Sequence, residues 1–465
     1  MTFSTPIRSS LRQRESGSTD ERGRHRSPFL VASRALFLAT LFAAPWAFGA
    51  VQPWAWGAMT ILAFLMLSLW AAGSVQRGVL RLSWSPLYWP FLALLLLAAV
   101  QFFGRFTSDH LATREALLKL LTNLVFFFLA GQLLFTGSRI GRPIRRVGLL
   151  VTLLVLGLSV LALAQVMTTG HGLIYWSIHT PFGPFGPYVS ANDYCGLMEL
   201  LIPVAAGYIL TGASPRVPRV LLWLAVGVAL ASVGISGSRA GAAVIFIEIL
   251  IFGFIVFRYR SHGAWRLGFP VIVALILASA GAFAWMANGS QRTNRALSVF
   301  QTDKSIQVKM GDRFWVAKDT LRMARHHPWL GIGVGAFETA FPPFMSHVSN
   351  LHWTHAHDDF VEGLAETGLV GGVLMLWALL LFFKNGYSHF KERMRGDWGW
   401  IPVGALVGAA GLLCHSLVDF NMRVPANAAW FVVCVAIATQ PGSWPDRPSR
   451  TTRESVLAGN EEFVN

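Results

Sequence analysis

Residues 147–167 read VGLLVTLLVLGLSVLALAQVM and contain no charged side chain. Two arginines, Arg145 and Arg146, come directly before them. A helix of about 20 apolar residues crosses the hydrocarbon core of a bilayer, which is about 30 Å thick. Lys and Arg are enriched on the cytoplasmic side of such helices. This stretch therefore predicts a membrane-spanning helix that begins at the cytoplasmic surface.

The composition of the whole chain agrees with this stretch. Of the 465 residues, 54% are hydrophobic and 13% are charged, whereas soluble proteins carry about 25% charged residues. A soluble fold would expose large apolar patches, disorder requires lower hydrophobicity, and the three cysteines lie in apolar stretches, not in a disulfide framework. The net charge of +15 would suggest nucleic acid in a soluble protein. In a membrane protein the basic residues are expected in the loops between the spans. The positive net charge therefore does not predict a nucleic-acid partner.

Twelve stretches have the length and apolar character of a membrane-spanning helix. They predict an all-α fold, a polytopic transmembrane helical bundle. The stretches are residues 30–48, 53–72, 86–104, 116–136, 147–167, 193–211, 218–235, 240–257, 268–287, 361–383, 401–420 and 424–440.

The basic residues orient these spans. If the N-terminus lies in the cytoplasm, every inner segment carries at least two Lys or Arg. The outer side then has one long loop, residues 288–360, and short connections with few basic residues. The basic residues of the short connections are Arg105, Arg114, Arg239 and Arg423.

This orientation places both termini in the cytoplasm. Residues 1–28 are Arg- and Ser-rich and predict a disordered basic tail, residues 29–440 form the transmembrane domain, and residues 441–465 form a second tail. A signal peptide in residues 1–50 is the alternative. Its charged region would be unusually long, and its apolar run contains Pro45 and Trp46.

Arg239 lies in a tight outer turn between two apolar spans, in the sequence SGSRAG of residues 236–241. A guanidinium near a membrane is costly unless it meets an anion or water. The small neighbours allow a ligand to approach closely. Binding of an anionic ligand and snorkelling to a lipid phosphate are both open interpretations.

Residues 311–325, GDRFWVAKDTLRMAR, predict an amphipathic helix in the long outer loop, ended by Pro328. Its apolar stripe would lie on the membrane surface, and its basic face would contact either lipid headgroups or the phosphate of a lipid-linked substrate. The stripe is Phe314, Ala317, Leu321 and Ala324, and the basic face is Arg313, Lys318, Arg322 and Arg325. Residues 330–337 contain alternating glycines. They do not predict a nucleotide-binding loop, because no strand–helix unit surrounds them, and they predict a turn instead.

The densest polar cluster is HWTHAHDDFVEGLAETG, residues 352–368, where the outer loop meets the tenth span. Asp358 or Asp359 fits a helix N-cap. Glu362 and Glu366 fall on one helix face just inside the membrane, where carboxylates suggest a functional site. Three interpretations of His355 and His357 are open. They form a zinc-type site with Asp359, one of them is a general base because neutral imidazole accepts a proton from a hydroxyl, or both are structural residues of the loop.

Several segments, in this order, resemble the O-antigen ligase and O-antigen polymerase family of bacterial inner-membrane glycosyltransferases. The resemblance covers roughly residues 185–425, and no single motif carries it alone. The segments are Ser190-Ala191-Asn192-Asp193, Gly237-Ser238-Arg239-Ala240-Gly241, Arg313-Phe314-Trp315, Pro328 to Gly333, His355-Ala356-His357-Asp358-Asp359, Ala365-Glu366-Thr367-Gly368 and His415-Ser416-Leu417-Val418-Asp419-Phe420.

The resemblance implies transfer of glycan from undecaprenyl diphosphate to an acceptor hydroxyl on the periplasmic side, without a metal or another cofactor. The acceptor would be lipid A–core, a growing glycan or another hydroxyl. Arg239 and Arg313 would hold the diphosphate, and His357 or His355 would activate the acceptor. The family usually has Asn where this chain has Asp358. The supporting residues would be Asn192, Asp358, Glu366, His415 and Asp419.

Three alternatives remain at this stage. A polymerase of the same family differs from a ligase mainly in its acceptor. A transporter or flippase would need polar groups at mid-depth in several spans, but Lys119, Glu199, Glu248 and Glu366 are isolated in the sequence. A metal-dependent hydrolase would use His355, His357 and Asp359.

Overall fold

The computed structural model describes residues 27–78, 80, 82–135, 141–169, 173–179, 183–212, 217–259, 310–346, 352–388, 390 and 399–440. Both predicted tails, apart from residues 27 and 28, lie outside these ranges, as do the ninth predicted span and residues 288–309 of the predicted outer loop.

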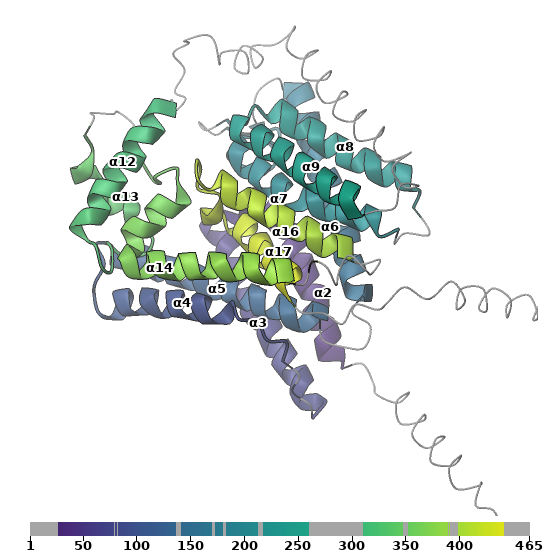
Figure 1. Ribbon diagram of the computed structural model, residues 1–465, viewed down its shortest axis with the longest axis horizontal. Coiled ribbons are helices and arrows are strands. Elements are labelled where there is room, and N and C mark those ends of the chain that lie inside the picture. The colour runs from purple at the N-terminus through teal and green to yellow at the C-terminus, as the bar shows by residue number, and fades with distance from the viewer. Residues whose placement is uncertain are drawn as a thin grey trace, which may run out of the picture.

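The described chain is built almost wholly of helices (Figure 1). Its α-helices are α2 (Pro28–Ala43), α3 (Pro53–Gln76), α4 (Tyr88–Phe103), α5 (His110–Phe135), α6 (Gly141–Thr169), α7 (Ala191–Leu210), α8 (Arg219–Ser236), α9 (Arg239–Tyr259), α12 (Met310–His326), α13 (Phe337–Ala340), α14 (Asp359–Ser388), α16 (Trp400–His415) and α17 (Pro425–Thr439). Short 3-10 helices are η1 (Ala44–Trp46), η2 (Phe48–Ala50), η4 (Pro342–Phe344) and η6 (Asn421–Arg423), and strands β1 (Leu173–Ile174) and β2 (Ile178–His179) form an antiparallel pair.

Eleven of the twelve predicted spans correspond to helices of the described chain, namely α2 to α9, α14, α16 and α17. Within the described ranges, eight helices are long and apolar enough to cross a membrane, and α4, α16 and α17 are shorter apolar helices. The predicted span 401–420 is too long, because α16 ends at His415. Residues 416–420 instead form a corner between α16 and α17.

The core of the bundle is formed by α7, α16 and α17, which the other helices surround (Figure 1). The backbones of α7 and α16 approach closely through small residues. A Cβ on Gly404 would lie 2.1 Å from the carbonyl oxygen of Pro203, and one on Gly408 would lie 2.4 Å from that of Leu200. Glycine at these positions therefore allows the two central helices to touch.

The outer helices carry large apolar side chains on their exposed faces. Ile61 on α3 is 71% exposed, Phe254 on α9 is 67% exposed and Val373 on α14 is 65% exposed. Such a belt would be unfavourable in water, and lipid is the environment that solvates it. The fold is therefore that of a helical membrane bundle.

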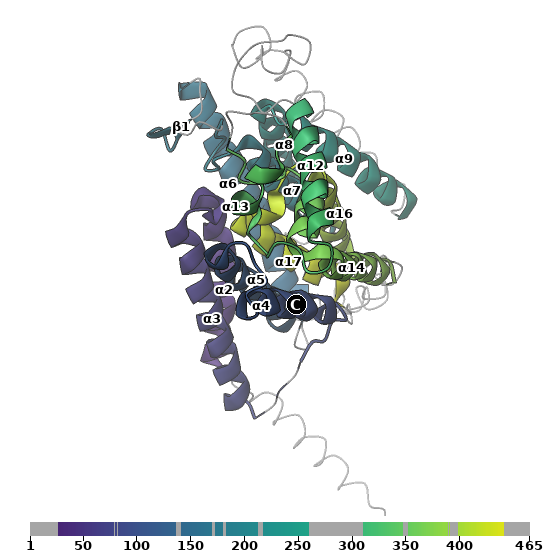
Figure 2. The same cartoon turned by 90° about the vertical axis from the view of Figure 1, so that its left-hand side faces the viewer.

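We call one end of the bundle the α12 end because α12 lies there, at the left in Figure 1 and toward the viewer in Figure 2. The helices α5, α7, α9, α14 and α17 begin at this end, whereas α4, α8 and α16 finish at it. At the opposite end, Ser83 donates to Gln440 (2.8 Å), and the rings of Tyr259 and Phe390 meet at 5.1 Å.

The predicted helix of the outer loop exists as α12. Its protein-facing side is formed by Val316, Thr320 and Met323. Of the four residues of the predicted apolar stripe, Phe314 and Leu321 are 66% and 40% exposed, whereas Ala324 is buried, so only part of this stripe points away from the bundle.

The predicted glycine turn lies across the start of α14. The N–H groups of Ile332 and Gly333 each donate to α14 carbonyl oxygens at 3.0 Å. Gly368, inside α14, has φ +64°, and a Cβ there would lie 2.3 Å from the carbonyl oxygen of Trp329. Only glycine allows this contact, which joins the turn to the helix.

Candidate functional site

His357 lies in the segment that leads into α14, with the positive φ of +55°. Its Nδ1 lies 3.4 Å from Oδ1 of Asp419 in the α16–α17 corner. Because a carboxylate only accepts, Nδ1 carries the proton of this contact, and Nε2 keeps its lone pair. The side chain is 15% exposed, so the imidazole is held in place but remains accessible.

Asp419 joins three other segments at one carboxylate. Besides His357, its Oδ2 lies 3.5 Å from Nη1 of Arg313 and accepts from the side-chain amide of Asn192. Arg313 also donates to the carbonyl oxygen of Val418 at 2.8 Å. Burial alone would raise the pKa of Asp419, but the contact with His357 and the charge of Arg313 outweigh it and lower that pKa to about 2.

His355 is held by a second carboxylate. Its Nδ1 lies 2.9 Å from Oε1 of Glu362, whose Oε2 accepts from the N–H of Ala356 at 2.6 Å. Nη2 of Arg423 lies 3.4 Å from the same Oε1. The chain therefore contains two similar sets, each a histidine, a buried carboxylate and an arginine.

Phe420 lies between the two histidines. Its ring centroid is 4.5 Å from that of His355 and 5.0 Å from that of His357. Sequence analysis assigned no role to Phe420, because a single aromatic residue after Asp419 carries no spacing signal. In the structure it keeps the two imidazoles apart.

Arg423 is the main residue that sequence analysis missed. It donates to Oε2 of Glu366 at 2.7 Å, and its Nε lies 3.7 Å from Oδ1 of Asp359. Glu366 also accepts from the N–H of Gly335 at 2.9 Å. Glu366, predicted as an isolated charge and a supporting site residue, is therefore tied to Arg423 and the glycine turn.

Sequence analysis predicted that Asp358 or Asp359 is the N-cap of α14, and the structure shows that it is Asp358. Its Oδ1 accepts from the N–H groups of Phe360 and Val361, each at 3.0 Å. The N–H of Asp359 donates instead to the carbonyl oxygen of Ser416 at 2.9 Å. Asn and Asp cap helices about equally well, so Asp358 performs at this position what an Asn would.

His415 does not line the site. Its Nδ1 lies 2.8 Å from Oε1 of Glu199, and both side chains are fully buried between α16 and α7. The interpretation of Glu199 as isolated is therefore wrong. The sequence did not show this pair because its two members are 216 positions apart.

Arg239 begins α9 after a turn formed by Gly237, with φ +77°, and by Ser238, whose Oγ accepts from the N–H of Gly241 at 3.1 Å. Its side chain is exposed, and no hydrogen bond or ion pair joins it to another described residue. The first turn of α9 packs against Cys195 of α7. Arg239 thus lies at the α12 end, but the structure does not bring it into contact with Asp419.

The alternative metal site is not assembled in the described chain. His355 faces Glu362, His357 faces Asp419, and Asp359 faces Arg423. Across the described ranges, no three His, Cys, Asp or Glu side chains are grouped as metal ligands. The three residues assigned to a hydrolase therefore point to three different partners.

Comparison with known families identifies one region of the chain. Residues 224–376, about a third of the sequence, match the family described as O-antigen ligase. This range holds Arg239, Arg313, His355 and His357, and it lies inside the predicted family core of residues 185–425. A search of curated proteins found no match. The likeness to the O-antigen ligase family is therefore shown for residues 224–376.

Proposed function

We propose that this protein transfers glycan from undecaprenyl diphosphate to an acceptor hydroxyl at the periplasmic face of the bacterial inner membrane. The observation that carries the proposal is the meeting of Arg313 and His357 at Asp419. A cation for a diphosphate and a base for a hydroxyl are thus adjacent, in a region that matches O-antigen ligase.

His357 is the base in this proposal. Asp419, with its pKa of about 2, stays ionised at physiological pH. It therefore keeps the proton of His357 on Nδ1 and leaves Nε2 free to accept another. His355 is held by Glu362 in a similar way and is the alternative base. His357 is preferred because its carboxylate is the one that also contacts Arg313.

The two arginines stabilise the leaving group. Arg313 uses one nitrogen for Asp419 and Val418, and its other N–H groups remain for a ligand. Arg239 is unpaired within the described chain and lies at the N-terminus of a long helix, where anions are favoured. A diphosphate contacting both would lie between α9 and α12.

The reaction then balances without another reactant. Nε2 of His357 takes the proton of the acceptor hydroxyl, and the acceptor oxygen bonds to the anomeric carbon of the donor sugar. The bond from that carbon to the diphosphate breaks, and its electron pair leaves on the diphosphate oxygen. Fixed guanidiniums stabilise the charge that develops there, and the loss of one such donor costs about 2.7–4 kcal/mol.

The test is transfer in proteoliposomes that contain an undecaprenyl-diphosphate-linked oligosaccharide and candidate acceptors. We expect R313A and R239A to lose about 10²–10³-fold in rate, and H357A about 10²–10⁴-fold. R239K should also be impaired, because an ammonium cannot replace a bidentate guanidinium. R325A, an exposed arginine of the same helix as Arg313, is the matched control and should transfer normally.

Full transfer by all three alanine variants would refute the assigned roles. H355A separates the two histidines, since the histidine whose variant retains activity is not the base. The product lengths separate ligase from polymerase, because a polymerase gives a ladder of chain lengths. Movement of the lipid-linked glycan across the bilayer without formation of a new glycosidic bond would favour the transporter.

A further inference from the structure

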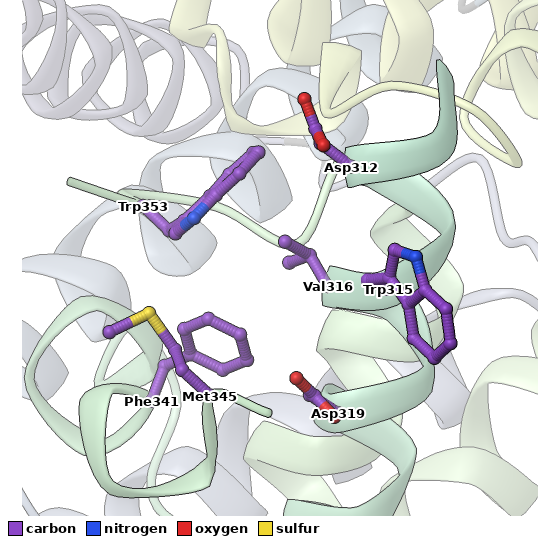
Figure 3. A pocket seen from close by; sticks show the side chains of 7 residues that line it. All are labelled: Asp312, Trp315, Val316, Asp319, Phe341, Met345 and Trp353. Atoms are coloured by element: carbon purple, nitrogen blue, oxygen red, sulfur yellow. The ribbon is translucent and has the colours of Figure 1, made fainter. Parts of the chain in front are cut away.

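A small cavity lies between α12 and the segment that follows it, next to the site (Figure 3). Its volume is about 60 Å³. Its lining residues are Asp312, Trp315, Val316, Asp319, Phe341, Met345 and Trp353. In Figure 3, Val316 points from α12 toward the middle of this group, opposite Phe341 and Met345.

The lining combines aromatic rings with carboxylates and contains no Lys, Arg or His. A diphosphate is therefore unsuited to it, since two acidic side chains would face the anion. A sugar ring suits it, because its C–H faces pack on aromatic rings and its hydroxyls donate to carboxylates. Asp319 is nearly fully buried. It is oriented by Ser346, whose N–H and Oγ donate to its Oδ2 at 2.7 and 2.8 Å, and by Arg322, whose Nη2 lies 3.2 Å from its Oδ1 outside the lining.

The cavity lies beside the proposed base, on the helix that carries Arg313. Trp353 lines it and also meets His357, with ring centroids 5.7 Å apart and planes at 90°. Asp312 lines it, and the next residue, Arg313, contacts Asp419. The ring of Trp353 thus separates a group in this cavity from the proposed base, and the residue that follows Asp312 on α12 is the proposed diphosphate ligand.

We infer that this cavity binds one edge of a pyranose ring, belonging to the sugar next to the bond that is formed or broken. The inference rests on the proposed function. The volume accommodates part of a sugar, such as a hydroxymethyl arm or a pair of hydroxyls, and the rest of the ring extends past the partly exposed Trp315 and Met345. The sugar belongs either to the donor or to the acceptor glycan.

Filling the cavity tests this directly. V316F places a ring in the space without removing a polar group, and L321F adds the same ring to an exposed position of α12 as the matched control. We expect V316F to raise the KM for one glycan substrate about tenfold or more, with L321F unchanged. A rise in the donor KM assigns the cavity to the donor sugar, and a rise in the acceptor KM assigns it to the acceptor.

Binding of sugar-free undecaprenyl diphosphate provides the second readout, because it reports the arginines alone. Its affinity should be equal in V316F and wild type if the cavity binds sugar. D312N, which keeps the size of the side chain but weakens it as an acceptor, should raise the same KM severalfold and serves if V316F does not fold.

Two outcomes overturn the inference separately from the proposed function. If V316F or D312N is folded and leaves both KM values unchanged while R313A remains inactive, the sugar site is wrong and the proposed function stands. If wild-type protein transfers no lipid-linked glycan to any acceptor, both are wrong.

Discussion

Asp419 is the residue on which the proposed site depends. It contacts Asn192, 227 positions away, and Arg313, on a helix of a different part of the chain. The family resemblance predicted a role for Asn192, Arg313 and Asp419, each from a separate motif. Their meeting could not be predicted, because no local spacing relates side chains that only the folded bundle brings together.

Replacement of Asp419 tests its role in orienting His357. We expect D419N to reduce transfer by about 10²–10⁴-fold, because a neutral amide no longer fixes the proton on Nδ1 or stabilises the imidazolium. The measurement is the single-turnover rate in proteoliposomes at saturating substrates. Affinity for sugar-free undecaprenyl diphosphate should change far less, and a D419N enzyme with wild-type turnover would contradict the assignment.

The pKa of Asp419 also predicts an acid dependence of stability. Since the folded-state pKa is lowered from its ordinary value to about 2, the carboxylate stabilises the fold at any pH above about 4. That contribution is lost as the pH falls from about 4 toward 2. The difference in Tm between wild type and D419N in detergent should therefore shrink over this range, whereas a constant difference would argue against the shift.

At the scale of elements, hydrophobic length predicted the helices well. Span existence is a local property, because about 20 apolar residues suffice to cross the bilayer. Hydrophobic length does not predict which faces of neighbouring helices are in contact. The end of α16 at His415, the Glu199–His415 pair and the inward side of α12 all depend on neighbouring helices.

Arg423 holds the start of α14 against the α16–α17 corner, because Asp359, Glu362 and Glu366 all face it. Removing the cation would leave buried carboxylates uncompensated. We expect R423Q to lower the free energy of unfolding by about 3–5 kcal/mol, measured as a fall in Tm. The control is E338Q, which breaks the exposed contact with His352 and should cost about 1 kcal/mol or less. Equal effects of the two variants would contradict this role.

At the scale of the whole molecule, the described helices alternate in direction, and the proposed site lies at a single end of the bundle. The Lys and Arg residues of the sequence favour the opposite end, which predicts that the α12 end is periplasmic. Within the described chain, Arg325 marks the α12 end and Arg77 marks the opposite end.

Cysteine labelling tests this orientation. In a variant without the native cysteines, R325C should react with a membrane-impermeant maleimide added to spheroplasts, whereas R77C should react only after lysis. The reverse pattern would place the site in the cytoplasm and would contradict the periplasmic assignment.

The central claim is a division of labour, in which arginine holds the diphosphate and His357 takes the acceptor proton. The most direct test measures binding of the lipid-linked oligosaccharide and its transfer on the same preparations of R313A and H357A. We predict that R313A loses both, whereas H357A binds the donor with wild-type affinity and transfers almost nothing. If R313A binds the donor as well as wild type does, or if H357A transfers at the normal rate, the claim is wrong.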